Sequence, residues 1–486
     1  MPTRRRCGIV LGSLALTLSA CTGDAPAPPR PTPEATSGSR TGPRAGLVAT
    51  DGSPVEVPVP DPPTGASYDV TELGADPEPG TGDDAPAIRA ALAAAGAGDE
   101  VVLPAGVYDL RSTDPDDAEA NLLLPDGVRL RGAGQGATVL RTSLDGEDDS
   151  AVVRAMGVHD AALAALTISS EHAGELGSDP DDEGPGGGPM YGVQIGDGSR
   201  RVLVEDVSVE LFERHGITLK ATREVTVTGC RVADATSVGP GGSGYGIAVE
   251  GMADQRDPDA DDDSRHNVVV DNHLDGTHLR HGILLQFPTH NNLIAGNTIE
   301  GGVLDAIDLH GEGEYLNEIR DNTVTDVGAA AVALGNSGGE QHRHDASGEG
   351  NWIHDNRLVG NVQGVLVILG TPDTVIEDND IVGGRDSEVG IELRNAPGTA
   401  VRNNAVTGAA DDFWAIVVTE DGGADGRGVG VATDVLIAGN RLTGPANGID
   451  VEAGRAIELT DNSIDVDGTP VRVAPDAEVR GDPGTR

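Results

Sequence analysis

The sequence predicts an all-β chain that folds as a right-handed parallel β-helix with a short N-terminal capping helix. Three observations support this prediction. A unit of two alternating apolar strands recurs along most of the chain, asparagine closes the unit again and again, and aromatic residues make up only 2% of the composition. A core with so few large rings must be assembled from many small equivalent layers, as in a repeat protein.

The first strand of each unit begins with a small residue followed by an alternating apolar run. Alternation with a period of two predicts a strand whose inward side chains are buried. Ten such segments are present, and they begin at Gly192, Gly216, Gly246, Gly282, Ala306, Ala331, Gly364, Gly390, Ala415 and Gly448.

The second strand of each unit closes with asparagine, which we interpret as a structural ladder because this residue tolerates the left-handed conformation of a tight corner. The units carry short strands and no helix pattern, so they cannot form βαβ crossovers and favour a parallel β-helix. The closing residues are Asn272, Asn297, Asn322, Asn356, Asn379, Asn404, Asn440 and Asn462.

The N-terminal end of the coil needs a cap, because an open first edge invites pairing with other chains. Asp83 and Asp84, followed by Ile88 and Leu92, predict a short capped helix, and Val101–Tyr108 predicts the strand after it. We therefore place the β-helix domain at residues 67–486.

Residues 1–20 have the order of an export signal: three arginines precede an apolar stretch that is too short to span a bilayer. Leu18-Ser-Ala-Cys21 resembles a bacterial lipobox, so we expect Cys21 to carry lipid. Residues 21–66 are rich in Pro, Thr and Gly and predict a flexible tether. These features predict an extracytoplasmic protein that is anchored to the cell membrane by lipid.

The formal net charge of −47 argues against nucleic acid and against an anionic membrane surface as partners. After cleavage of the signal only Cys21 and Cys230 would remain, so the fold has no internal disulfide framework. We expect a monomer whose contact with the membrane is the lipid anchor alone.

Two outward positions of the first strand carry polar residues on four successive turns and then fade to apolar ones. The pairs are Thr218/Lys220, Ala248/Glu250, Leu284/Gln286 and Asp308/His310. The corner that opens the same strands carries Tyr191, Arg214-His215, Tyr245, Arg280-His281 and Asp305. Lys220 to His310 spans three rises, or about 14 Å, which suits a linear polymer better than a small metabolite.

Lys220 is the only lysine of the chain, which otherwise uses arginine for every basic position. Lysine is a compact cation that can lose its proton, so this choice favours a chemical role over a stray surface charge. His215, His281 and His310 lie on the same turns and could instead be structural. Glu250, Asp305 and Asp308 are candidates to hold a cation such as Ca²⁺, to orient a base, or to be solvated acids. The sequence predicts no other metal or cofactor.

Chemistry at C5 of a uronate requires a cation beside the sugar carboxylate, a base for the C5 proton and an acid for the leaving oxygen. If Lys220 keeps its charge it neutralises the carboxylate and a histidine is the base; otherwise Lys220 is itself the base. We assign catalysis to Lys220, His215, His281, Tyr245 and Arg280. We assign substrate binding to Arg214, Tyr191, Glu250, Gln286, Asp305, Asp308 and His310.

The chain resembles the pectate-lyase-like superfamily through Tyr68-Asp-Val-Thr-Glu-Leu-Gly-Ala75, Leu103-Pro-Ala-Gly-Val-Tyr108 and Arg131-Gly-Ala-Gly-Gln-Gly-Ala-Thr138. Within it, Arg280-His-Gly-Ile and Thr289-His-Asn-Asn292 look like motifs of alginate (mannuronan) C5-epimerases. Tyr245-Gly-Ile-Ala-Val-Glu250 falls where those enzymes carry a catalytic-site aspartate. β-Helix alginate lyases use lysine and tyrosine, which Lys220 and a nearby tyrosine match.

One departure decides between these activities. The epimerase motif Tyr-Gly-Phe-Asp-Pro-His aligns with His215-Gly-Ile-Thr-Leu-Lys220, so its Tyr, Asp and His are all replaced. We therefore predict a polysaccharide lyase that cleaves an alginate-like polyuronate by β-elimination. The alternatives are a uronate C5-epimerase, a glycoside hydrolase that pairs Glu250 with Asp305 or Asp308, and a non-catalytic lipoprotein that binds polysaccharide at the surface.

Overall fold

Parallel pairing between equivalent strands of successive turns organises the chain. In this computed structural model, the named strands of the described residues pair in parallel, except that β35 (Gly430–Val431) runs antiparallel to β34 (Trp414–Asp421). The structure describes residues 45–49, 51–80, 82–146, 149–181, 186–239, 242–252, 263–311, 313–335, 346–423, 427–444, 446–482 and 484. The predicted signal, Cys21 and the tether up to residue 44 lie outside these residues.

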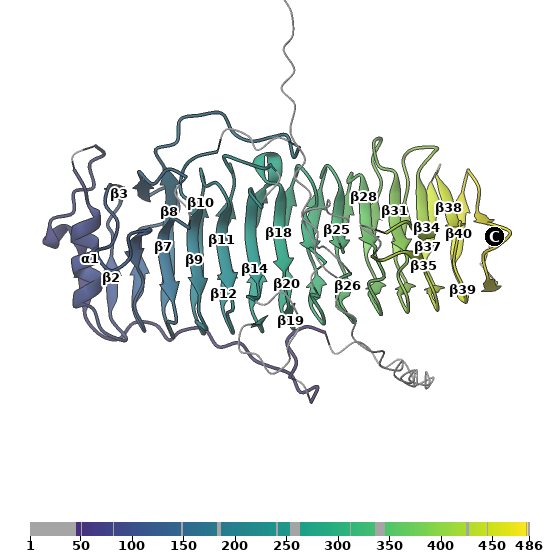
Figure 1. Cartoon of the computed structure of the whole chain (residues 1–486), viewed down its shortest axis with the longest axis horizontal. Helices are drawn as coiled ribbons and strands as arrows, with labels where there is room; N and C mark the ends of the chain where they lie inside the picture. The colour runs from purple at the N-terminus through teal and green to yellow at the C-terminus, as the bar shows by residue number, and fades with distance from the viewer. Residues whose placement is uncertain are drawn as a thin grey trace, which may run out of the picture. The chain divides into compact units, whose positions relative to one another are not determined.

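All ten predicted first strands are present, and they lie in chain order in a 14-stranded sheet. Figure 1 shows several of them side by side. They are β9 (Tyr191–Gly196), β11 (His215–Lys220), β14 (Tyr245–Glu250), β18 (His281–Gln286), β22 (Ile307–Leu309), β25 (Ala330–Leu334), β28 (Gln363–Val367), β31 (Val389–Arg394), β34 and β38 (Asn447–Val451). Two earlier turns that the repeat pattern does not reveal, β4 (Ala120–Leu123) and β7 (Ala151–Met156), begin the same sheet.

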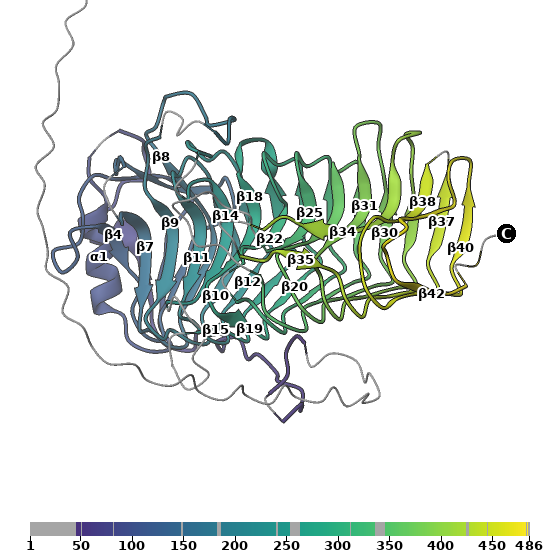
Figure 2. The ribbon, with the colours of Figure 1, turned by 45° about the vertical axis from the view of Figure 1, so that its right-hand side comes forward.

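Most turns add two further strands to a 26-stranded sheet, as the stacked turns in Figure 2 illustrate. One row runs through β16 (Val268–Val270), β20 (Leu293–Ala295) and β23 (Glu318–Arg320). A parallel row runs through β17 (His273–Asp275), β21 (Thr298–Glu300) and β24 (Thr323–Thr325). Inward apolar side chains of both sheets are fully buried, including Ile283, Ile294 and Ile299. The predicted parallel β-helix is confirmed.

The predicted capping helix is α1 (Ala85–Ala94), at the N-terminal end of the coil (Figure 1). Its Ile88 and Leu92 are 0% and 4% exposed, so one face of the helix covers the core. Asp84 precedes the helix, and its carboxylate accepts a hydrogen bond from the Asp109 amide over 2.7 Å. The strand predicted over Val101–Tyr108 is two strands, β2 (Glu100–Val102) and β3 (Gly106–Leu110), because the segment around Pro104 interrupts the ladder.

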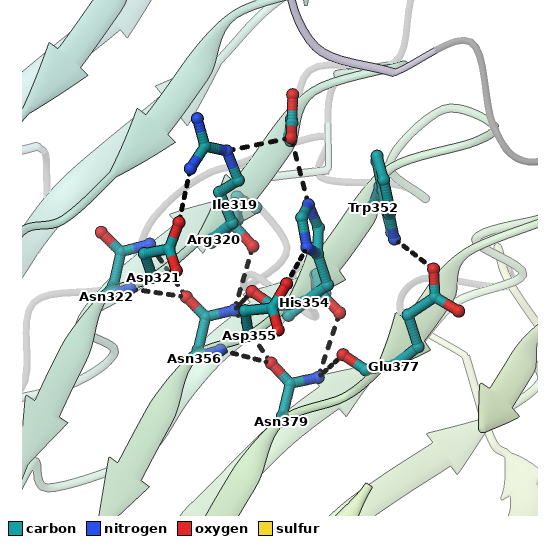
Figure 3. A network of polar contacts seen from close by, with 12 residues as sticks. Ile319, Arg320, Asp321, Asn322, Trp352, His354, Asp355, Asn356, Glu377 and Asn379 are labelled. Carbon is teal, nitrogen blue, oxygen red and sulfur yellow. Dashed lines mark hydrogen bonds and ion pairs between the residues drawn. The ribbon is translucent and has the colours of Figure 1, made fainter. Parts of the chain in front are cut away.

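The asparagines of the predicted ladder are buried and hydrogen-bonded from turn to turn (Figure 3). The amide and Nδ2 of Asn322 both donate to Oδ1 of Asn356 over 3.0 Å, and Asn356 repeats this pattern with Asn379. The left-handed residues lie one position earlier than predicted, at Asp355 and Asp378, whose φ angles are both 54°. The ladder is therefore structural because its amides satisfy buried backbone groups, not because asparagine adopts a positive φ.

Part of the predicted tether packs against the β-helix. The Gly46 amide donates to the Leu316 carbonyl over 2.9 Å, and Nδ2 of Asn291 donates to the Gly46 carbonyl over 3.0 Å. Nε2 of His266 lies 3.0 Å from the Val48 carbonyl oxygen. The packed body thus begins before residue 67.

In the part of the chain that the structure describes, no helix has the length and apolar character that crossing a membrane requires.

Candidate active site

The polar outward positions of four successive turns stand in register in the 14-stranded sheet, as the sequence predicts. The first row pairs Thr218 with Ala248, Ala248 with Leu284, and Leu284 with Asp308. The second row pairs Lys220 with Glu250 and Glu250 with Gln286. His310 follows β22 directly. Side chains that are distant in sequence are thereby brought onto one face of the coil.

A line of rings runs across these strands, and we call it the ring column: Tyr191, His215, Tyr245 and His281 open their strands, and His310 follows the end of β22. Its members come from β9, β11, β14 and β18 and the residue after β22. The centroid separations along it are 5.4 Å, 5.1 Å, 5.4 Å and 6.1 Å in that order. The column is the geometric centre of the predicted site, since each predicted catalytic residue belongs to one of its strands or adjoins one.

His215 is 1% exposed, and neither of its ring nitrogens has a hydrogen-bond partner among the described residues. Its Nδ1 lies 3.9 Å from Oε2 of Glu250, which accepts a hydrogen bond from the Thr218 hydroxyl over 3.3 Å. Burial, followed by the charges of Arg214 and Lys220, lowers the pKa of His215 well below its ordinary value. His215 is therefore a neutral imidazole at pH 7 and can accept a proton.

A second imidazole lies between two carboxylates. Nδ1 of His281 lies 3.8 Å from Asp305 and Nε2 lies 3.6 Å from Asp308. Burial lowers the pKa of His281 to about 4, although the Asp308 charge raises it. Burial also raises the pKa of Asp305 to about 7, and the Asp308 charge adds to that shift. Asp308 holds His310, whose Nδ1 lies 2.6 Å from its Oδ2.

The two phenols of the ring column are also removed from water. Tyr191 is 6% and Tyr245 4% exposed. Burial raises the pKa of both hydroxyls, although Arg214 counters it at Tyr191 and Arg280 counters it at Tyr245. Each phenol therefore keeps its proton at neutral pH and can donate it to a developing oxyanion.

Lys220 ends β11 and is partly exposed. Its ammonium makes no hydrogen bond or ion pair to any residue that the structure describes. It is nevertheless near enough for its charge to lower the pKa of His215. The site thus combines a cation that can bind an anionic ligand with a neutral imidazole that can accept a proton.

The predicted arginines are placed differently from one another. Nη1 of Arg280 donates to the carbonyls of Pro180 over 2.9 Å and Val238 over 2.7 Å, so the inserts before β9 and β14 fix this guanidinium. Nε of Arg214 is buried without a partner among the described residues. Arg280 is thus a positioned side chain, whereas Arg214 keeps a donor for a ligand.

Sequence reasoning missed a polar network that extends the first row upstream. Arg154, on β7, pairs in register with Gln194, which pairs with Thr218. Nε of Arg154 donates to Gln194 over 2.6 Å, and its Nη1 lies 2.6 Å from Asp117. A lone arginine inside the apolar run of β7 was the available signal, but β7 lies before the recognised repeats.

Comparisons with known proteins agree with this architecture. The family described as periplasmic copper-binding protein (NosD) matches residues 190–344 and 312–465. Mannuronan C5-epimerase AlgE3 of Azotobacter vinelandii is 49% identical over 71 residues, which are 14% of this chain and 4% of that protein. The chain therefore spans only a small part of that relative's length.

Solved structures share the fold at low identity. The A-module of mannuronan C-5 epimerase AlgE6 from Azotobacter vinelandii matches with a TM-score of 0.52 and 20% identity, over 86% of this chain and 99% of that one. A PL6 alginate lyase in complex with a trisaccharide matches with a TM-score of 0.54 and 15% identity, over 83% and 86%. The N-terminal fragment of bacteriophage Phi29 gene product 12 gives 0.55 and 15%, over 81% and 66%. These matches establish the fold.

The family description names copper, and the described residues offer one group that suits such an ion. His281, Asp308 and His310 are buried, and their candidate ligand atoms lie within 4.8 Å of one another. Two imidazoles and a carboxylate suit copper or zinc, whereas Ca²⁺ prefers oxygen ligands alone. This group therefore fits a transition metal better than the Ca²⁺ that the sequence suggested. A bound ion would supply a Lewis acid for a ligand oxygen.

Proposed function

The chain belongs to the periplasmic copper-binding protein (NosD) family, and we propose that it is a polysaccharide lyase that cleaves an anionic polyuronate by β-elimination. One observation carries the proposal: the neutral His215, whose two ring nitrogens have no partner among the described residues, is buried between two protonated phenols, within reach of the charge of the sole lysine at the other end of β11. This arrangement combines a base, a carboxylate-neutralising cation and a proton donor on one face of the coil.

We assign one side chain of the site to each step of the β-elimination. Lys220 neutralises the sugar carboxylate, which makes the adjacent C5 proton acidic. His215 takes that proton, the C5–H electron pair forms the C4–C5 double bond, and the C4–O bond breaks. Tyr245, whose ring lies 5.1 Å from that of His215, gives its proton to the leaving oxygen. The imidazolium then returns a proton to the phenolate, so the site is restored.

The substrate class is inferred from charge and from the relatives. The strands of the ring column also carry or adjoin Lys220, Arg214 and Arg280. These cations favour an acidic sugar over a neutral one, because they can bind its carboxylate. An alginate epimerase and an alginate lyase share the fold, and the first family also shares the 71-residue match. We infer an alginate-like polyuronate, lying along the coil axis.

Uronate C5-epimerisation is the second candidate, and the 71-residue match to mannuronan C5-epimerase favours it. An epimerase would remove the same proton and return one from the opposite face without breaking the C4–O bond. Tyr191, the protonated phenol on the other side of His215 from Tyr245, would give that proton. The two activities differ only in the fate of the deprotonated sugar.

The test is product analysis on polymannuronate, polyguluronate and polygalacturonate. We expect new unsaturated ends, seen as ultraviolet absorbance, on at least one polymer. Lys220→Ala should lower turnover by about 10³-fold with the fold intact, and Lys220→Arg should keep part of it because the charge remains. New reducing ends without unsaturation would identify a hydrolase and contradict the proposal. Inverted C5 without cleavage would identify an epimerase.

We also propose that the chain is exported and anchored through Cys21, on the strength of the sequence of residues 1–21. Cells supplied with a labelled fatty acid should incorporate it into the parent chain and not into Cys21→Ser. Labelling of both chains, or of neither, would contradict the anchor.

A further inference from the structure

A hollow of about 430 Å³ lies at the corner where the turns leave the 14-stranded sheet. Arg200, Arg223 and Arg265 line it together with His159 and His266. None of these residues belongs to the ring column or to the polar rows. Arg200 follows β9 and Arg223 follows β11, so the hollow lies beyond the strand end that carries Lys220, opposite to the end where Tyr191 and His215 open their strands.

The arginines of the hollow are stacked one per turn. Isolated parallel bridges join His159 to Arg200, Arg200 to Arg223, and Arg223 to Arg265. The residue after each of the four has a positive φ between 51° and 57°, so the corner repeats the same backbone conformation. Equivalent corners rise by about 4.8 Å per turn, which places three guanidinium groups in a line of about 10 Å parallel to the coil axis.

The charge around this line is opposite to that of the whole chain. The formal net charge is −47, yet the lining of the hollow has three arginines and two histidines against one carboxylate, Glu224. The Glu224 carboxylate lies 3.9 Å from Nη1 of Arg201, so an arginine outside the lining of the hollow partly neutralises its charge. Burial lowers the pKa of His266, and Arg265 and Arg223 lower it further. The lining residues of the hollow therefore have three guanidinium charges against one carboxylate charge.

Arg200 is the member of the line that is open to a ligand. It is exposed, and its guanidinium makes no ion pair or hydrogen bond with the residues that the structure describes. Guanidinium groups bind carboxylates through two parallel hydrogen bonds. A line of them at one spacing fits a chain of repeating carboxylates, whereas a compact anion would need donors that converge on one point.

We propose that Arg200, Arg223 and Arg265 form a second binding site for an acidic polysaccharide chain, separate from the ring column. The ligand class rests on the proposed function; the site itself rests on the stacked arginines and their hollow. Because both sites follow the coil axis on the same turns, the second holds one stretch of polymer while another occupies the ring column. Such tethering raises the effective concentration of substrate.

The test is polymer binding in the Lys220→Ala chain, which separates binding from turnover. Polymannuronate affinity is measured by calorimetry, with dextran as the neutral polymer. We expect affinity to fall by about threefold for each arginine removed, so by about tenfold in Arg200→Gln/Arg223→Gln, and the loss to shrink at high salt. Arg441→Gln, an exposed arginine on β37 (Arg441–Gly444) of the other sheet, is the matched control and should bind as the parent does.

The outcomes separate this proposal from the proposed function. Unchanged polymannuronate affinity in Arg200→Gln/Arg223→Gln, an equal loss in Arg441→Gln, or equally tight binding of dextran would overturn the second site, even if the chain is a lyase. Lost affinity in a chain that cleaves no polyuronate would support the second site and reject the lyase. If the double variant does not fold, the exposed Arg200→Gln alone should still show the threefold loss.

Discussion

Two buried histidines, one on each large sheet, both lie near carboxylates, but their pKa values are shifted in opposite directions. His354, on β26 (Trp352–His354), has both ring nitrogens partnered. Its Nε2 lies 3.1 Å from Glu318. Its Nδ1 lies 2.7 Å from Asp355, and Figure 3 shows these two residues. Burial lowers its pKa, but these two hydrogen bonds outweigh burial and raise it. His215 has Glu250 at 3.9 Å, beyond hydrogen-bond reach, and burial dominates.

A difference of about 1 Å in the distance to a carboxylate thus separates a histidine that supports the fold from one whose ring nitrogens have no hydrogen-bond partner among the described residues. A hydrogen bond to an ionised group stabilises a folded protein, whereas a buried donor or acceptor without one costs free energy. The fold tolerates that cost at His215, on the polar face of the coil. The contrast predicts that substitution of His215 lowers turnover, whereas substitution of His354 lowers stability.

The largest effect is expected on turnover. His215→Gln should lower kcat by about 10² to 10⁴-fold, because a general base is lost, while the unfolding free energy changes by about 1 kcal/mol or less. His354→Gln is the control and should keep parent-like turnover. Steady-state kinetics and denaturant unfolding of both variants measure this. Equal activity loss in the two variants would remove the distinction between them.

The next effect is on the pH dependence of stability. The pKa of His281 is about 4 in the folded chain, below the ordinary value of about 6.5. Between these two pH values His281 is therefore protonated in the unfolded chain and neutral in the folded chain. Stability should therefore fall as pH drops from 6.5 to 4, by about 3 kcal/mol from this group. Urea unfolding of His281→Gln should show a flatter acid limb than the parent. Parallel limbs would mean that His281 titrates normally.

The smallest effect has the opposite sign. The raised pKa of His354 means that its pairs with Glu318 and Asp355 stabilise the fold fully below pH 6.5, and that this contribution is lost as pH rises through the folded pKa. His354→Gln should lower the unfolding free energy by about 1 to 2 kcal/mol at pH 5 and by less at pH 8. A deficit that grows with pH would contradict the hydrogen-bonded, charged state of His354.

The coil and its registered rows could be predicted from the sequence because they are periodic. A small residue at the start of each strand sets the register, so Lys220, Glu250 and Gln286 fall in one row whatever the length of the inserts between turns.

A second asparagine ladder could not be recognised from the repeat pattern. Asn267 and Asn292 belong to a second buried ladder, in which the Asn267 amide donates to Asn292 over 2.9 Å. An asparagine at a corner looks the same whether its amide bonds to the next turn or to its own loop.

The side-chain contacts of the site could not be predicted, because they depend on rotamers and on inserts that have no period. The fixing of Arg280 by Pro180 and Val238 depends on two connections of unequal length. The absence of a hydrogen bond between His215 and Glu250 depends on the rotamer of the Glu250 side chain. The lone lysine led us to propose a site on this face of the coil, whereas the stacking of the rings is seen only in the structure.

The central claim is that this face removes the C5 proton of a uronate, and a substrate with deuterium at C5 tests it most directly. We predict that the parent chain releases the label into water as polymer is cleaved, that cleavage slows several-fold relative to unlabelled polymer, and that Lys220→Ala and His215→Gln do neither. Cleavage at an unchanged rate with the label retained in the product would contradict the proposed chemistry.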